Sequence, residues 1–117
     1  MWIASKYGYF SVVMAKDEKV QVRARARHDL EYLIDFGNLV SARIDDTPGS
    51  DYCCRIVLPR SEFARVMGLM VLDLDYPNFK EMIVSNEKQA DKIGFYEDVW
   101  AKMFSYQMSR DEFRQKS

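Results

Sequence analysis

Arginines occupy every second position in one short segment of the chain. The segment Lys19–Arg27 alternates strictly between small apolar and polar side chains. A period of two predicts a β-strand with one buried face and one open face. The polar side chains expected on the open face are Gln21, Arg23, Arg25 and Arg27. Such a row can bind phosphate or carboxylate groups, because each guanidinium offers a planar fork of N–H donors that matches both anions.

Four more side chains are expected to join these arginines. Arg43 and Arg55 lie in two later segments with strand character, where they alternate with apolar neighbours. Tyr7 and Tyr9 lie in an N-terminal strand and would add aromatic rings, on which bases stack in RNA-binding sheets. A second interpretation is a solvated face on which the arginines pair with acids of neighbouring strands. The acids available for such pairs include Glu18 and Asp45.

Two groups of acidic residues are candidate sites for a metal ion or for a carboxylate-dependent enzyme. Asp73 and Asp75 lie at the end of a predicted helix. The second group, around a Pro-Gly loop, consists of Asp45, Asp46 and Asp51. Carboxylates bind divalent cations, yet acids at helix ends and in turns are commonly solvated or serve turn formation alone. We therefore expect neither a metal nor a cofactor, and an enzyme at these acids is the least favoured interpretation.

Thiol and imidazole chemistry is not expected either. Cys53 and Cys54 are adjacent, so in a strand they face opposite sides and a disulfide between them would be strained. Free thiols are typical of a reducing cytoplasm. The one histidine, His28, has no spacing to the cysteines that suggests a metal set or a nucleophilic pair.

The bulk composition limits the class of protein. The 117 residues include 48% hydrophobic and 30% charged side chains, which is typical of one globular domain. With 17 basic and 18 acidic residues the formal charge is -1, so a general nucleic-acid coat is not expected. The sequence contains no apolar run of membrane-spanning length and no leader peptide, which predicts a cytoplasmic protein without a membrane partner.

Two β-hairpins and three helices are expected to position the arginines. The first hairpin pairs an N-terminal strand within residues 2–15 with the segment Lys19–Arg27. The second pairs residues 40–44 with residues 52–58, across a loop rich in Asp, Pro and Gly. The helices are predicted from Asp29 to Gly37, from Ser61 to Leu74, and from Ser85 or Asn86 onward.

The resulting order, ββαββαα, predicts an α+β fold. We expect a two-layer sandwich in which a four-stranded antiparallel sheet carries helices on one face, as in ferredoxin-like proteins. Residues 1–106 should form a single domain, and residues 107–117 a charged tail that frays. Six apolar residues with helical spacing are predicted to be buried against the sheet: Val66, Met67, Met70, Leu74, Trp100 and Phe104.

Four short strings of the chain resemble a family of short bacterial hypothetical proteins. They are Met1–Ile3 (MWI), Tyr7–Ser11 (YGYFS), Arg23–Arg25 (RAR) and Asp75–Lys80 (DYPNFK). The likeness extends over nearly the whole chain and ends at residues 99–100. No activity is established for that family, so the resemblance implies a free-standing cytosolic domain and no particular chemistry.

These observations favour a non-enzymatic binding or regulatory domain that acts through protein contacts. An aromatic content of 14% and a sheet face without helices are typical of an interface, so self-association to a dimer is expected. The alternative partner is a nucleic acid or nucleotide bound by the arginines. Binding that weakens steeply with salt would indicate the nucleic acid.

Overall fold

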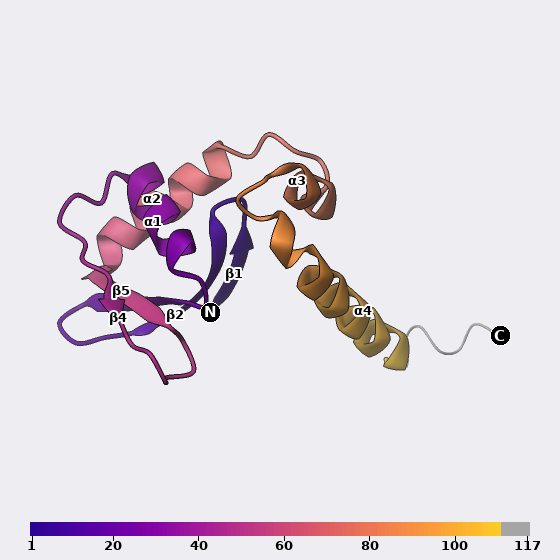
Figure 1. The fold of residues 1–117 in the computed structure, drawn as a ribbon, viewed down its shortest axis with the longest axis horizontal. Coiled ribbons are helices and arrows are strands. Elements are labelled where there is room, and N and C mark those ends of the chain that lie inside the picture. The colour runs from indigo at the N-terminus through magenta and orange to yellow at the C-terminus, as the bar shows by residue number, and fades with distance from the viewer. Residues whose placement is uncertain (111–117) are drawn as a thin grey trace. The chain divides into compact units, whose positions relative to one another are not determined.

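A five-stranded antiparallel sheet is the main element of the computed structural model, which describes residues 1–110 of the chain (Figure 1). Neighbouring strands follow the order β1-β2-β3-β5-β4. The strands are β1 (Trp2–Ser5), β2 (Gly8–Met14), β3 (Lys19–Ala24), β4 (Asp45–Asp46) and β5 (Cys54–Pro59). The fold is therefore α+β, as the sequence predicts. The sheet has five strands instead of four, and the ferredoxin-like order is not confirmed.

The additional strand arises at the N-terminus, where the single predicted strand folds into a hairpin. β1 pairs with β2 in a register that aligns Ser5 with Gly8, so Lys6 and Tyr7 form the turn. The Oγ of Ser5 closes this turn, because it accepts a hydrogen bond from the Tyr7 N–H and donates one to the Gly8 carbonyl. Gly8 has a φ of +148°, a conformation that glycine adopts readily. The absence of a Cβ also leaves room for Asp29, whose Cγ would lie 2.5 Å from one.

The helices of the first unit, Met1–Asp75, cover one face of the sheet (Figure 1). They are α1 (Arg27–Gly37) and α2 (Arg60–Leu72). Leu30 and Leu33 of α1 and Phe63 and Val66 of α2 belong to one core with the apolar face of the strands. The opposite face of the sheet carries no helix of this unit, which leaves it as the place for a binding site.

The alternation predicted for the arginine segment is confirmed over β3 and ends with that strand. The residues of β3 that face the core are Val20, Val22 and Ala24. Gln21 and Arg23 face the open side and are partly exposed. The strand ends at Ala24 and α1 begins at Arg27, so the predicted strand was too long. The sequence alone does not distinguish an arginine in a strand from one in the first turn of a helix. The alternation therefore does not show that β3 ends at Ala24.

The second predicted hairpin is much shorter than expected. β4 contains Asp45 and Asp46, which pair with Arg55 and Cys54, and residues 40–44 form no strand. This connection is instead a loop that packs three apolar side chains against the core. They are Leu39, Ala42 and Ile44.

The second unit, Tyr76–Ser117, is described to residue 110 and is helical. Its elements are α3 (Phe79–Ser85), the 3-10 turn η1 (Ala90–Lys92) and α4 (Ile93–Ser109). Asn78 caps α3, because its side chain accepts a hydrogen bond of 2.9 Å from the Glu81 N–H. Tyr96 of α4 packs edge-on against Phe79 of α3, with ring centroids 4.9 Å apart.

Three of the six residues predicted to be buried against the sheet are exposed. The residues of α2 confirm the prediction in full or in part: Val66, Met70 and the partly buried Met67. Leu74 is exposed because α2 ends at Leu72, before the predicted periodicity does. Trp100 and Phe104 of α4 are also exposed and stack on each other, with ring centroids 5.3 Å apart.

The chain divides into two compact units, but this division does not show whether the units fold separately. The single domain expected over residues 1–106 therefore stays a prediction. α4 continues through Ser109, so the first residues of the predicted tail 107–117 are helical. Residues 111–117 lie outside the described part of the chain. Within residues 1–110, no helix combines the length and the apolar composition needed to cross a membrane.

Candidate functional site

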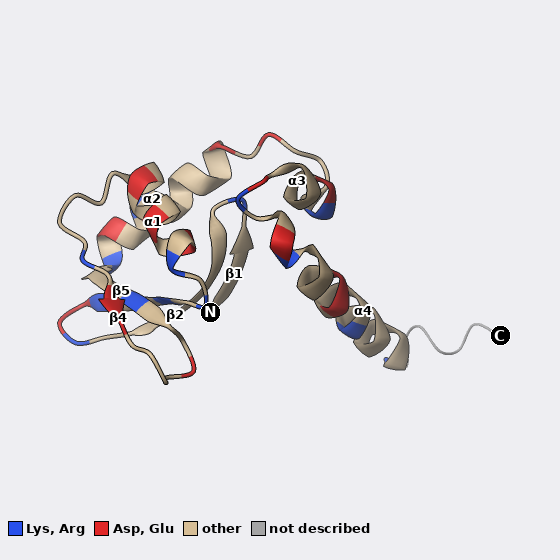
Figure 2. Cartoon of the chain, viewed as in Figure 1, with Lys and Arg blue, Asp and Glu red and all other residues tan. Residues whose placement is uncertain are grey.

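One row of directly paired residues crosses the open face of the sheet. The pairing registers align, from β1 to β4, Trp2, Ser11, Arg23, Arg55 and Asp45. The two arginines occupy the middle of the row, and the acid lies at its edge, where β4 is red beside the blue segment of β5 in Figure 2. The register therefore places two like charges directly opposite each other, an arrangement that destabilises a sheet unless something compensates it.

Neutral groups hold Arg23 against the sheet. Its Nη2 donates a hydrogen bond of 2.7 Å to the Oγ of Ser11, which is itself buried. Its guanidinium carbon lies 4.5 Å from the centre of the Tyr52 ring, within the range of a cation–π contact. Its Nε is buried and has no hydrogen-bond acceptor among residues 1–110. A buried donor without a protein acceptor costs stability unless water reaches it.

Arg55 ties the loop between β4 and β5 to the open face. Its Nη1 donates to Gln21 Oε1 at 3.1 Å, and its Nη2 lies 3.3 Å from Thr47 Oγ1 and 3.0 Å from Ser50 Oγ. All three acceptors are neutral. The buried Nε of Arg55, like that of Arg23, has no acceptor within the described residues. Arg55 is thus fixed in place, and no carboxylate of residues 1–110 neutralises its charge.

Tyr52 lies between two arginine side chains. The guanidinium carbon of Arg25 is 4.2 Å from the centre of the Tyr52 ring, and that of Arg23 is 4.5 Å from it. Arg25 also donates a hydrogen bond to the backbone carbonyl of Asp51. The side chain of Tyr52 is buried beside the two arginines. We name the arginine face by its members: Arg23, Arg25, Arg55, Tyr9 and Tyr52.

Tyr9 adds a phenol and a ring contact to this face. Burial raises the pKa of Tyr9, the nearby Tyr52 raises it further, and the positive charge of Arg25 opposes both. The phenol therefore keeps its proton at neutral pH and can donate a hydrogen bond to a bound anion. The exposed ring of Trp2 lies 6.3 Å from the Tyr9 ring, centroid to centroid, and provides a fluorescent probe of the site.

Among the described residues, 1–110, no carboxylate forms an ion pair with the arginine face. The ion pairs within residues 1–110 involve other bases, and Arg23, Arg25 and Arg55 take part in none of them. Asp45 is the register partner of Arg55, yet no ion pair joins the two. Glu18, the other acid considered for such pairing, contacts Arg60 at 3.4 Å. The interpretation of the arginines as cross-strand ion pairs is therefore wrong for these three.

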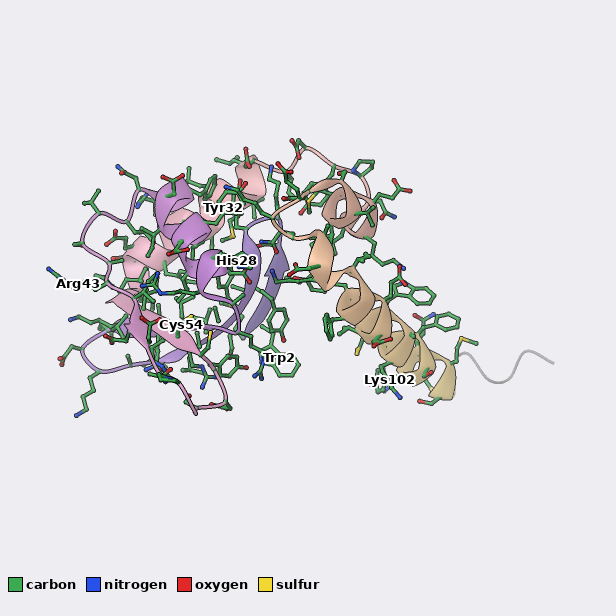
Figure 3. All side chains as sticks on the ribbon, viewed as in Figure 1. Trp2, His28, Tyr32, Arg43, Cys54 and Lys102 are labelled. Carbon is green, nitrogen blue, oxygen red and sulfur yellow. The ribbon has the colours of Figure 1, made fainter. Side chains whose placement is uncertain are left out.

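Arg27 and Arg43 lie away from the arginine face. Arg27 is the first residue of α1 and is neutralised by Glu31 at 2.5 Å and Asp46 at 3.0 Å. These carboxylates raise the pKa of the Arg27 guanidinium, with Asp46 as the larger cause. Arg43 belongs to the connection that forms no strand, is exposed, and points outward at the edge of the unit in Figure 3. Its predicted place in a strand is therefore wrong.

Tyr7 is part of the core and not of the arginine face. Because it lies in the turn between β1 and β2, strand alternation does not decide its direction. Its ring stacks on Phe36 at a centroid distance of 4.0 Å and meets Tyr32 edge-on at 5.2 Å. Its hydroxyl donates a hydrogen bond to Asp73. Burial, followed by that carboxylate, raises the pKa of Tyr7 far above its usual value.

The candidate carboxylates at the end of α2 are already engaged. Lys6 Nζ lies 2.8 Å from the Asp73 carboxylate and 3.4 Å from that of Asp75. Hydrogen bonds from Lys6 and then Tyr7 lower the pKa of Asp73, so it is a weak base at neutral pH. Within residues 1–110, no three His, Cys, Asp or Glu side chains are grouped so as to hold a metal ion.

The two thiols are free and lie side by side. Their sulfur atoms are 3.3 Å apart, with Cys53 exposed and Cys54 buried at the start of β5. Burial, and then the hydrogen bond with Cys53, raises the pKa of the Cys54 thiol to about 12. A protonated, buried thiol is a poor nucleophile. The Nε2 of His28, the other residue considered for such a pair, lies 3.3 Å from the Asp29 carboxylate.

Reasoning from the sequence missed Tyr52 and the neutral residues that hold the arginines. Tyr52 was placed in a strand that would have carried it to one side of the sheet, whereas β5 begins at Cys54 and Tyr52 belongs to the preceding loop. The hydrogen-bonding partners missed are Ser11, Thr47 and Ser50; Gln21 is expected on the open face, but its bond to Arg55 is not. Two of these contacts, those of Ser11 and Gln21, follow from the strand register, because both residues face the arginines once the strands are aligned.

Comparison of the chain with protein-family models, with curated proteins and with solved structures finds no match. The resemblance to short bacterial proteins therefore stays a prediction. What the protein binds has to follow from the chemistry of its own residues, and the arginine face is the place where those residues converge.

Proposed function

We propose that the protein is a non-enzymatic binding domain that holds an acidic segment of a partner protein on the arginine face. The observation that carries this proposal is the direct alignment of Arg23 with Arg55, whose hydrogen-bond acceptors within residues 1–110 are all neutral. Opposed like charges cost about 0.2–1 kcal/mol in a sheet. A carboxylate bound between the two guanidinium groups removes this repulsion and accepts charge-assisted hydrogen bonds.

The surroundings of the arginines support recognition of a small anionic group. Tyr52 and the hydroxyl acceptors hold the guanidinium groups in place before a ligand arrives, so little side-chain entropy is lost on binding. Tyr9 supplies a neutral donor beside them. The planar form of arginine suits bidentate contact with one carboxylate at a time.

A protein partner fits the charge of this face better than a nucleic acid does. The face carries three arginines, whereas nucleic-acid sites commonly engage about 6–10 phosphates. Asp45 flanks the row and Asp51 lies in the adjoining loop, where both repel an extended polyanion. The whole chain has a formal charge of -1. An acidic peptide with a few carboxylates matches these features.

A non-enzymatic role agrees with the state of the groups considered for catalysis. Asp73 is held by Lys6 and Tyr7, and the Cys54 thiol keeps its proton because its pKa is raised to about 12. The free thiols agree with a cytoplasmic location, which we include in the proposal.

A calorimetric titration with a short Glu-rich peptide tests the proposal, with Trp2 fluorescence as a second signal. The double variant Arg23→Gln/Arg55→Gln should bind at least about 10-fold more weakly, because hydrogen bonds to charged groups contribute roughly 1.5–3 kcal/mol each. Arg43→Gln is the matched control, since it removes the same charge from an exposed site away from the arginine face. Circular dichroism should show that all variants remain folded.

Two outcomes would contradict the proposal. Equal loss of peptide affinity in Arg43→Gln would show that general charge, and not the arginine face, attracts the peptide. Tighter binding of a single-stranded oligonucleotide, with a log–log salt slope that falls by about 0.7 per arginine removed, would identify a nucleic acid as the partner instead.

A further inference from the structure

The helix α4 exposes apolar side chains along most of its length. Within residues 93–109 the structure buries Tyr96 alone. Seven large apolar side chains of this helix are between 42% and 72% exposed: Phe95, Val99, Trp100, Met103, Phe104, Tyr106 and Met108. A solvated surface helix normally turns polar residues outward. This helix does not, which indicates a contact surface.

Six of the exposed apolar residues form two neighbouring rows along α4. Phe95, Val99 and Met103 follow one another at intervals of four residues. A second row at the same interval contains Trp100, Phe104 and Met108. Rows of this spacing are the ridges that pack into the grooves of another helix. The polar side of the helix carries Glu97, Asp98, Ala101, Lys102 and Ser105.

Within its own unit, α3 covers only a small part of this surface. Phe79 of α3 contacts the buried Tyr96, and Lys80 Nζ lies 4.6 Å from the centre of the Trp100 ring. Trp100 nevertheless stays exposed, as do all the apolar residues after it in α4. We name the remaining surface the α4 face: Phe95, Val99, Trp100, Met103, Phe104, Tyr106 and Met108.

The α4 face is large enough for a stable interface between two copies. A large side chain offers roughly 150–250 Å², so seven that are about half exposed offer roughly 600 Å² per copy. That is at the upper end of the largest apolar patch found on monomers, about 300–600 Å². Two such faces together bury roughly 1,200 Å², which reaches the size of specific interfaces.

We infer that α4 pairs with α4 of a second copy of this chain through the α4 face. The charged residues of the helix, Asp98 and Lys102 among them, lie on its polar side and stay away from this contact. The same patch then serves both copies, as a two-fold symmetric dimer requires.

The polar side of α4 argues against a lipid surface as the occupant of the α4 face. Helices that lie on membranes carry mainly Lys and Arg on their polar side. Here Glu97 and Asp98 outnumber Lys102, so an anionic membrane is repelled. This inference uses a different surface from the arginine face, and neither depends on the other.

Light scattering of the full chain after size-exclusion chromatography tests the inference. The native protein should elute at twice the chain mass of 13.8 kDa. Met103→Glu should shift it to the mass of one chain, because a carboxylate at an interface centre costs far more than the apolar contact it replaces. Ser105→Glu adds the same charge two residues away on the polar side, and should leave the dimer intact.

A native mass of one chain at every concentration, or vesicle binding that Met103→Glu abolishes in a monomeric protein, would overturn the dimer.

Discussion

Arg23 and Arg55 are direct partners across the antiparallel pair of β3 and β5. Each guanidinium group is oriented by hydroxyl or amide oxygens, and no ion pair within residues 1–110 neutralises either one. A sheet selected for stability alone would place a carboxylate or a neutral residue at one of these positions. The arrangement supports the proposal that an anion from outside the chain completes this site.

The first prediction is that phosphate stabilises the protein more than chloride does at equal ionic strength. Phosphate presents the same oxygen acceptors as a carboxylate, and a ligand at ten times its dissociation constant adds about 1.4 kcal/mol of stability. The melting temperature should rise by a few degrees. Arg55→Gln should remove the difference between the salts and Arg43→Gln should retain it. Superimposable melting curves of the native protein in both salts would contradict an anion site on the arginine face.

The second prediction concerns Tyr52, whose ring lies between Arg23 and Arg25. Tyr52→Ala should lower the free energy of unfolding by about 3–5 kcal/mol, as large aromatic truncations in buried positions do. Tyr52→Phe keeps the ring and its cation–π contacts, so its denaturant midpoint should stay near that of the native protein. Urea titrations of the two variants provide the comparison. An equal loss in both would show that the hydroxyl, and not the stacked ring, matters.

Local sequence patterns predicted individual strands better than they predicted how the strands pair. The alternation in β3 identified its buried face, since a period of two follows from the backbone alone. The hairpin turn at Lys6 and Tyr7 was missed because aromatic residues on both sides of Gly8 look like one continuous strand. That turn adds a strand and sends Tyr7 into the core. Residue spacing therefore did not show that Tyr7 is absent from the arginine face.

The arginine face was predicted in outline, and its membership was decided by contacts between distant segments. Arg23 and Arg55 come together through the pairing of β3 with β5, about thirty residues apart in sequence. Arg27 is not part of the arginine face because it begins α1, and Arg43 is not part of it because it lies in a loop that packs on the core. Tyr52 joined from a loop. Periodicity reports which way a side chain points within one element, and it cannot report which elements meet.

The third prediction separates the confirmed part of the core from the part that was wrong. Met70→Ala should lower the free energy of unfolding by about 2–5 kcal/mol, because a buried methionine leaves a cavity. Leu74→Ala should cost under about 0.5 kcal/mol, as exposed substitutions do. Both residues were expected to behave alike from helical spacing, so chemical denaturation of the pair tests the end of α2 directly. Similar losses would show that Leu74 is buried in solution.

The fourth prediction uses two glycines with opposite surroundings. Gly8→Ala should destabilise the protein by at least about 1–3 kcal/mol, since the new Cβ would lie 2.5 Å from the Cγ of the buried Asp29. Gly68 of α2 has no atom within 4 Å of such a Cβ. Gly68→Ala should therefore stabilise the helix by about 0.8–1 kcal/mol. Thermal melts that shift in the same direction for both would contradict the packing of Gly8 against α1.

The fifth prediction is a loss of stability at alkaline pH that begins with Cys54 and continues with Tyr7. Burial is the main reason that both pKa values are raised, that of the thiol from 9.0 to about 12 and that of the phenol from 10.0 upward. Between the unfolded and the folded pKa, the unfolded chain has released a proton that the native protein still holds. Stability is thus complete below pH 9 and falls as the pH rises toward 12.

Tyr7→Phe isolates the share of the phenol in this loss. The variant keeps the ring stacked on Phe36 but gives up the hydrogen bond to Asp73, so it should be less stable than the native protein at neutral pH. Above pH 10 its melting temperature should fall less steeply, because one of the two titrating groups is gone. Below pH 9 the two proteins should show parallel curves, which serves as the internal control. Parallel curves throughout the alkaline range would mean that the hydroxyl of Tyr7 titrates in the native protein as it does in the unfolded chain, and that its contact with Asp73 does not form in solution.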